Sequence, residues 1–334
     1  MKSFAVALVK PFFLFKKKAP LLYYLMGRLI VMAVMLFILG FAVFGLVALA
    51  HGGIAGEVMP GRGEPGPDQP FYIQYFRWLR QAVVNHDLGQ SLVSRAPVTL
   101  LIGTRLLNSL ILNAISLVLI TFFSFLLGIY FSARTGTRVD FAVTFFALAL
   151  HAFPGILLLI LLQLFASITG LFPVTAYPQL LFGDDPTRFV FSYAHHVFLP
   201  LLAAVLAGSG GGMRVIRAAM LTQLYQPYIT SLRSRGIAEW RIYFTHAFRN
   251  TLIPRATESA NMLAWLFSLS LILEIIFDYP GIGLLMYEAV TRQDINLVLA
   301  ILMIISFLVL LCMLVCDICL AMVDPGIRRG KEGA

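Results

Sequence analysis

The sequence predicts an all-α integral membrane protein with six transmembrane helices and both termini in the cytoplasm. Hydrophobic residues make up 60% of its 334 residues and charged residues only 12%, whereas soluble domains carry about 45–50% apolar and about 25% charged residues. A helix needs about 20 largely apolar residues to cross a hydrocarbon core of about 30 Å, and six stretches meet that requirement. The net charge of +9 comes from basic residues at the ends of these stretches. Because cytoplasmic loops of membrane proteins collect Lys and Arg, we expect no nucleic-acid partner.

The first span is predicted at 29–50, where no charged residue occurs. Residues 1–28 carry the lysines and the arginine that place this segment in the cytoplasm or at its membrane interface. Residues 51–105 form an extracytoplasmic loop that starts rich in Gly and Pro. Within this loop, Phe71 to Val84 combines helical spacing of apolar residues with aromatic residues suited to the headgroup level. We therefore expect an interfacial helix there, with an apolar face formed by Phe76, Leu79 and Val83.

The other five spans form a core from 106 to 323, followed by a basic cytoplasmic tail at 324–334. Residues 141–183 contain no Asp, Glu, Lys or Arg. Gly and Pro residues break the second half of this stretch, so we expect one helix, kinked at Pro154, and then an outer loop. The five spans are expected at about 106–131, 141–167, 197–213, 252–277 and 295–323.

Several polar or reactive residues have a structural interpretation. His195 and His196 are assigned to the outer loop, and two adjacent side chains point in different directions, which favours solvation over a metal site. The glycine-rich stretch before Met213 favours close helix packing or a bend in the membrane. Three cysteines share one face of the last span and are interpreted as packing residues. The sequence therefore predicts neither a catalytic residue nor a metal site.

A polar interruption from Arg214 to Pro254 holds six arginines against one acid up to Asn250. Tyr228 to Arg235 is predicted to form a short helix, because Pro227 precedes it and Gly236 can take the left-handed conformation that ends a helix. A second helix is expected from about 238 to 250. The pair can dock in a cleft of another subunit and transmit its movement, or it can be a basic loop on anionic lipid. The residues alone leave both options open.

The chain resembles the first membrane permease of ATP-binding-cassette (ABC) importers for dipeptides, oligopeptides and nickel. In that family a Gly follows a short coupling helix, and a His, an Arg-Asn pair and a Pro come after it. Further landmarks of the family occur in order, among them D-L-G-Q-S-L at 87–92, E-I-I-F-D-Y-P-G-I-G at 274–283, R-Q-D at 292–294 and D-P-G-I-R at 324–328. The matching residues of the coupling segment are Tyr228, Arg233, Arg235, Gly236, His246, Arg249, Asn250 and Pro254.

The resemblance implies a permease subunit in the bacterial cytoplasmic (inner) membrane, with no cofactor of its own. It implies four kinds of partner: a second homologous permease, two cytoplasmic ABC ATPase subunits that bind ATP and Mg²⁺, an extracytoplasmic solute-binding protein, and membrane lipid. The sequence departs from the family pattern in the coupling segment, at Pro227, Leu232 and Ser234. These departures affect the expected contact between the coupling segment and an ATPase subunit; they do not affect the resemblance to the family.

The stretch 274–283 is expected to line the outer end of the translocation pathway. Glu274 and Asp278 lie at the C-terminal end of a helix, where the helix dipole disfavours acids. Either they attract a substrate amine or a basic partner, or water and nearby N–H groups satisfy them. Pro280, Gly281 and Gly283 predict a sharp turn after which the chain re-enters toward the pore. Pro154 is expected in the pathway wall.

The alternative function is an ion-coupled secondary transporter or channel that acts without ATPases. It would use Glu258 or Asp317 as a proton relay, because acids inside a membrane are costly unless they face protein or water. The family resemblance favours helix packing or hydrogen bonding for Asp317.

Overall fold

The computed structural model describes residues 20–50, 70–178 and 185–323; side chains are described for these residues except 20–24, 47–50, 143, 147, 148, 150, 151, 252–264 and 319–323. Residues 1–19 of the predicted N-terminal segment and the predicted tail 324–334 lie outside the described residues, as do residues 51–69 of the predicted extracytoplasmic loop and residues 179–184. The described secondary structure is helical, apart from one isolated bridge between Gln90 and Pro97.

Two long helices, α4 (Val98–Ala133) and α7 (Pro186–Leu224), form the centre of the molecule. Small residues let them approach closely: a Cβ at Gly128 would lie 2.7 Å from Ile216, and one at Gly208 would lie 2.9 Å from Ile120. The glycine-rich stretch therefore serves close packing in the middle of α7, as small residues do between membrane helices.

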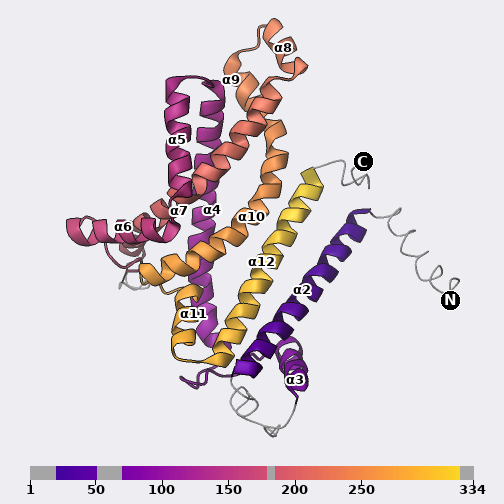
Figure 1. Cartoon of the computed structure of the whole chain (residues 1–334), viewed down its shortest axis with the longest axis vertical. Helices are drawn as coiled ribbons and strands as arrows, with labels where there is room; N and C mark the ends of the chain where they lie inside the picture. The colour runs from indigo at the N-terminus through magenta and orange to yellow at the C-terminus, as the bar shows by residue number, and fades with distance from the viewer. Residues whose placement is uncertain (1–19, 51–69, 179–184, 324–334) are drawn as a thin grey trace, which may run out of the picture.

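Three further helices lie side by side along this pair: α10 (Phe248–Ile276), α12 (Ile295–Val323) and α2 (Pro20–Ala50) (Figure 1). The short helix α11 (Ile282–Thr291) joins α10 to α12 and packs on α4. The start of α2, the end of α12 and the short helix α8 (Pro227–Ser234) lie toward one end of the molecule, and α11 and α3 (Phe71–Val84) lie toward the other (Figure 1).

Four helices in the described part of the chain are long and apolar enough to cross a membrane, namely those at Leu25–Leu46, Val98–Ala133, Pro186–Leu224 and Ile295–Ile318. They correspond to the predicted first, second, fourth and sixth spans. In α10, the predicted fifth span, the apolar stretch with described side chains is Trp265–Ile276.

The predicted single helix at 141–167 is wrong. The structure has two helices of 15 residues each, α5 (Arg138–Ala152) and α6 (Gly155–Thr169), and Pro154 lies between them. Proline has no N–H to donate and disfavours helical backbone in the residue before it, so it ends the helix here instead of bending it. α5 runs beside α7, whereas α6 lies across α7 (Figure 1).

Three other predicted boundaries differ from the structure. α7 starts at Pro186, capped by Asp185, so His195 and His196 lie within a helix and not in a loop; their ring nitrogens bond to the backbone oxygens of Leu171 and Ser192. α7 also continues past Met213 to Leu224. The helix expected at 238–250 begins at Glu239 as α9 (Glu239–Arg241) and contains a π-helical segment, η1 (Ile242–Ala247), but it does not end near 250, because it runs directly into α10.

The predicted helix at Phe71–Val84 is present with the same boundaries, and it packs on the protein through a different face from the one that carries Phe76 and Val83. Tyr75 and Trp78 are buried, whereas Phe76 and Val83 are exposed. Tyr75 packs edge-on against Phe37 and Phe41 of α2. Its hydroxyl donates a hydrogen bond to the Phe37 carbonyl (3.0 Å), so aromatic packing against α2 decides which face is buried.

Candidate functional site

The short helix α8 has the limits that its sequence predicts. Pro227 occupies the first turn, and the helix ends just before Gly236, which has a φ of +74°. The Gly236 N–H donates to the Arg233 carbonyl (2.9 Å). No atom lies within 4 Å of a Cβ built at Gly236, so only the left-handed backbone requires glycine here.

One side of α8 is anchored to the two central helices. Ile229 of α8 and Ile242 and Ala247 of η1 are fully buried, in a cluster with Ile129 of α4 and with Ile216 and Met220 of α7. Each buried isoleucine stabilises this contact by about 1.5–3 kcal/mol. α8 is therefore connected to α4 and α7 through packed side chains.

Three side chains that hydrogen-bond to one another hold the start of α10 beside this buried cluster. The Tyr228 hydroxyl donates to Gln223 Oε1 (3.0 Å). Asn250 Nδ2 donates to the same oxygen (3.4 Å) and to the Tyr228 hydroxyl (3.3 Å). Two of the predicted coupling residues, Tyr228 and Asn250, are thus brought together.

The other side of the segment 227–250 is exposed and basic. Arg233 donates two hydrogen bonds to Glu239 (2.8 and 3.2 Å), and these bonds raise the pKa of the Arg233 guanidinium above its usual value. Arg235 and Arg249 are exposed, and His246 is half-buried in η1. The aromatic side chains of Trp240 and Phe244 are exposed beside them, and Arg241 lies over the Trp240 ring. Pro254 lies in the backbone of α10, but its side chain is outside the described residues.

At the other end of the molecule, Glu274 joins α10 to α11 and α4. The side chain is fully buried. Oε1 accepts hydrogen bonds from the hydroxyls of Ser109 (2.6 Å) and Ser270 (2.7 Å), and Oε2 accepts from the N–H groups of Gly283 (2.6 Å) and Leu284 (3.3 Å). The sequence left open whether Glu274 attracts a basic group or is satisfied by nearby donors. In this conformation nearby donors satisfy it. The carboxylate also caps the N-terminus of α11, where the helix dipole favours an acid.

The sharp turn between α10 and α11 fits closely around this carboxylate. A Cβ at Gly281 would lie 2.3 Å from Glu274 Oε2, and one at Gly283 would lie 2.6 Å from the backbone of Leu271. The Pro280 carbonyl accepts a hydrogen bond from Asn108 Nδ2 (2.8 Å) of α4. Asp278, by contrast, is exposed and has a φ of +48°. Pro154, also predicted for the pathway, is exposed at the break between α5 and α6.

Comparisons with known proteins identify the family. Residues 120–329 match the family described as "binding-protein-dependent transport system inner membrane component". The chain is 33% identical over 266 residues to the oligopeptide transport system permease protein AppB of Bacillus subtilis (strain 168), covering 79% of this chain and 82% of the relative.

This chain belongs to that family of inner-membrane transport components. It is also 32% identical over 267 residues to the inner membrane ABC transporter permease protein YejB of Escherichia coli O157:H7, covering 78% of this chain and 73% of the relative. The glutathione transport system permease protein GsiC of Escherichia coli O6:H1 is 29% identical over 319 residues, covering 92% of this chain and 99% of the relative. The protein is accordingly a permease subunit of an ABC importer in the inner membrane, and not an enzyme.

Of the two acids considered for a proton relay in this permease, Asp317 forms an ion pair between α12 and α2. Its carboxylate lies 3.1 Å from Arg28 Nε and accepts a second hydrogen bond from Arg28 Nη2 (3.3 Å). The side chain of Glu258 lies outside the described residues.

Sequence reasoning missed two polar contacts that organise the permease. Arg217 of α7 pairs with Asp140 at the start of α5 (2.7 Å), and both side chains are largely buried. Asp294, just before α12, accepts hydrogen bonds from the Ser91 hydroxyl and from the N–H groups of Leu92 (3.1 Å) and Leu297 (3.2 Å). The position of Asp294 directly before an apolar run is a helix-cap signal that could have been noticed. Its contact with a residue about 200 positions earlier has no local signal.

Proposed function

We propose that this permease forms half of the translocation pathway of a peptide importer, together with a second, homologous permease. The names of two relatives, an oligopeptide and a glutathione transport system permease protein, support peptides or related small solutes as the substrate class. An extracytoplasmic binding protein would deliver the substrate, and two cytoplasmic ABC ATPases would bind and hydrolyse ATP with Mg²⁺.

The coupling role rests on the two-sided construction of the segment formed by α8, α9 and η1. Its buried side packs with α4 and α7 through Ile229 of α8 and through Ile242 and Ala247 of η1. Its exposed side presents arginines and aromatic residues, which are enriched at protein interfaces. A membrane-surface loop would not need the rigid attachment. We therefore assign Tyr228, Arg233, Arg235, Gly236, His246, Arg249, Asn250 and Pro254 to the ATPase-coupling segment.

The proposed topology has six spans with both termini in the cytoplasm, on the same side as α8. The direction of α2 and α12 in Figure 1 agrees with this, since α2 starts and α12 ends toward the end that carries α8. α5 has 15 residues, fewer than the about 20 that a full crossing needs, and α6 turns across α7; the third crossing is therefore proposed to be made by α5 alone, beside the longer α7.

At the outer end, we propose that the turn at 278–283 controls access to the pathway. In the present conformation Glu274 holds α11 against α4 and α10, so an outward opening that moved α11 would have to break the hydrogen bonds of Glu274. Asp278 is exposed and could meet a basic group of the substrate or of the binding protein.

The coupling role is tested with Gly236→Val in the complete importer, by ATP-dependent uptake of a labelled peptide per unit of membrane-inserted permease. A β-branched residue is strained at a φ of +74°, so the end of α8 must rearrange. Gly136→Val is the matched control: Gly136 also has a positive φ (+82°) and an open Cβ position, but lies in the turn before α5. We expect uptake to be lost in Gly236→Val and retained in Gly136→Val, with both proteins inserted.

Normal uptake by Gly236→Val would disprove the coupling assignment. Uptake that persists without any ATPase subunit would favour the secondary transporter.

A further inference from the structure

A pocket of ≈ 360 Å³ lies at the end of the molecule opposite α8, between the first turns of α4, the helix α11 and the loop before α4. Its volume falls within the range of small-ligand pockets, about 300–1,000 Å³. Two motifs noted in the sequence, at 87–92 and 292–294, meet here, because the Asp294 carboxylate accepts hydrogen bonds from the Ser91 hydroxyl and the Leu92 N–H. The lining therefore has a fixed geometry.

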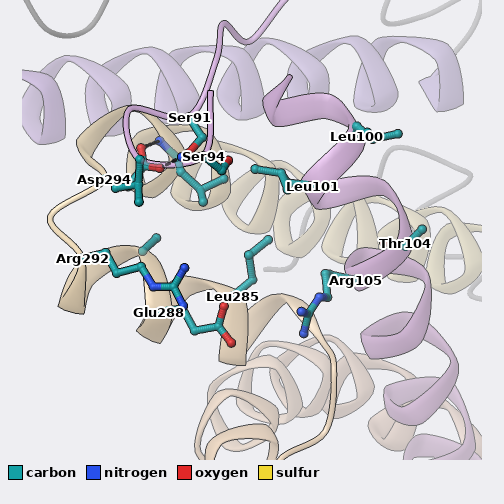
Figure 2. Close-up of a pocket in the computed structure, with 13 residues that line it drawn as sticks. Ser91, Ser94, Leu100, Leu101, Thr104, Arg105, Leu285, Glu288, Arg292 and Asp294 are labelled. Atoms are coloured by element: carbon teal, nitrogen blue, oxygen red, sulfur yellow. Dashed lines mark hydrogen bonds between the residues drawn. The ribbon is translucent and has the colours of Figure 1, made fainter. Parts of the chain in front are cut away.

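Three charged side chains line this pocket without a partner among the described residues: Arg105 of α4, and Glu288 and Arg292 at the end of α11. Arg105 and Arg292 reach into it from opposite sides, with Glu288 beside Arg292 (Figure 2). Asp294 also lines the pocket, but its oxygens are occupied by the hydrogen bonds above. The unpaired charges are thus two guanidinium groups and one carboxylate.

The length of α4 gives the approximate depth of Arg105 in a membrane. α4 has 36 residues and is therefore about 54 Å long, about 24 Å longer than a hydrocarbon core of about 30 Å. If the excess is shared between both ends, the core begins about 12 Å from the start of the helix. Arg105 comes seven residues after Val98, at about 10 Å, and is half-buried. Such a guanidinium requires a counter-ion close to the interface.

The surface next to the pocket is apolar and exposed. Leu100 on its rim is 68% exposed, and Leu107 and Ile111 continue the same face of α4 toward the middle of the membrane. An acyl chain can follow this face while its headgroup occupies the pocket. A soluble anion would make no use of these residues.

We propose that this pocket binds the headgroup of a membrane phospholipid, with the phosphate between Arg105 and Arg292. Guanidinium groups bind phosphate oxygens through charge-assisted hydrogen bonds. Glu288 supplies an acceptor for an ammonium group, which favours phosphatidylethanolamine over phosphatidylglycerol. The site is independent of the coupling role of α8.

The test measures lipid binding to the purified full chain by native mass spectrometry, with phosphatidylethanolamine or phosphatidylglycerol of defined composition. Arg105→Gln and Arg292→Gln should each weaken binding by about tenfold, the effect of losing a charge-assisted hydrogen bond. Glu288→Gln should remove the preference for phosphatidylethanolamine. Arg80→Gln is the matched control, because Arg80 is an exposed arginine on α3 that does not line the pocket.

Thermal unfolding of each variant verifies that it is folded. Binding by Arg105→Gln and Arg292→Gln equal to that by Arg80→Gln would overturn the proposal. Displacement of the lipid by millimolar inorganic phosphate would identify a soluble anion as the occupant and would overturn the lipid assignment. Retention of the lipid in that competition supports it.

Discussion

The fit of α11 against α10 predicts that Gly283→Ala destabilises the permease strongly. The added Cβ would lie 2.6 Å from the Cα of Leu271 and 2.9 Å from Glu274 Oε2, whereas carbon atoms in contact are about 3.5–4.0 Å apart. The backbone of Leu271 lies within α10 and cannot rotate away, so α11 must move by about 1 Å.

That movement has two costs. Overpacking in a well-packed core costs about 1–3 kcal/mol. The displacement also lengthens the hydrogen bonds from Gly283 (2.6 Å) and Leu284 (3.3 Å) to the buried carboxylate of Glu274, and losing a buried partner costs about 1–3 kcal/mol. We therefore expect Gly283→Ala to lower the free energy of unfolding by about 2–6 kcal/mol.

Unfolding in mixed micelles with increasing dodecyl sulfate, followed by circular dichroism, measures this change. Gly103→Ala in α4 is the control, because no atom lies within 4 Å of its added Cβ. Alanine should stabilise that position by about 0.5–1 kcal/mol through its helix propensity. Equal stability of Gly283→Ala and the wild type would refute the close packing of α11 on α10.

Two further predictions concern polar contacts. Asp140→Asn should lower the free energy of unfolding by about 3 kcal/mol, because it leaves the charge of Arg217 buried and unpaired. The double variant Asp140→Leu/Arg217→Met should recover most of that loss in stability. No recovery would contradict the pairing of Asp140 with Arg217. Hydrogen bonds from Thr187 and then Arg188 lower the pKa of Asp185. The stability that this cap adds is present above the unfolded pKa of about 4 and is lost as the pH falls through the lower folded value. Amide exchange at Arg188, corrected for its intrinsic rate, should therefore accelerate in acid, and Asp185→Asn should remove this pH dependence.

Features with a local physical cause were predictable from the sequence. The limits of α8 follow from Pro227, which has no N–H to donate, and from Gly236, which accepts a left-handed backbone. The helix at Phe71–Val84 follows from the spacing of its apolar residues and matches to the residue. Four of the expected spans follow from the length of apolar runs alone.

Features that depend on a distant partner were not predictable in the same way. Aromatic residues of α2 decide which face of α3 is buried. The stretch with His195 and His196 has the composition of a loop, but in the structure it is the first part of α7. Pro154 predicted a disturbance, but whether a proline bends or ends a helix depends on what packs around the chain on either side.

Apolar length, helix-end residues and the family resemblance were enough to predict a helical membrane permease, the positions of most of its apolar helices and a separate short basic helix. Contacts across the fold were needed to find that the buried Glu274 caps α11 and that Arg105 and Arg292 face one pocket. The reason is physical: hydrophobic length and helix-end chemistry act within a few residues, whereas the state of a buried charge depends on donors far away in the chain. Ser109, 165 positions from Glu274, is one such donor.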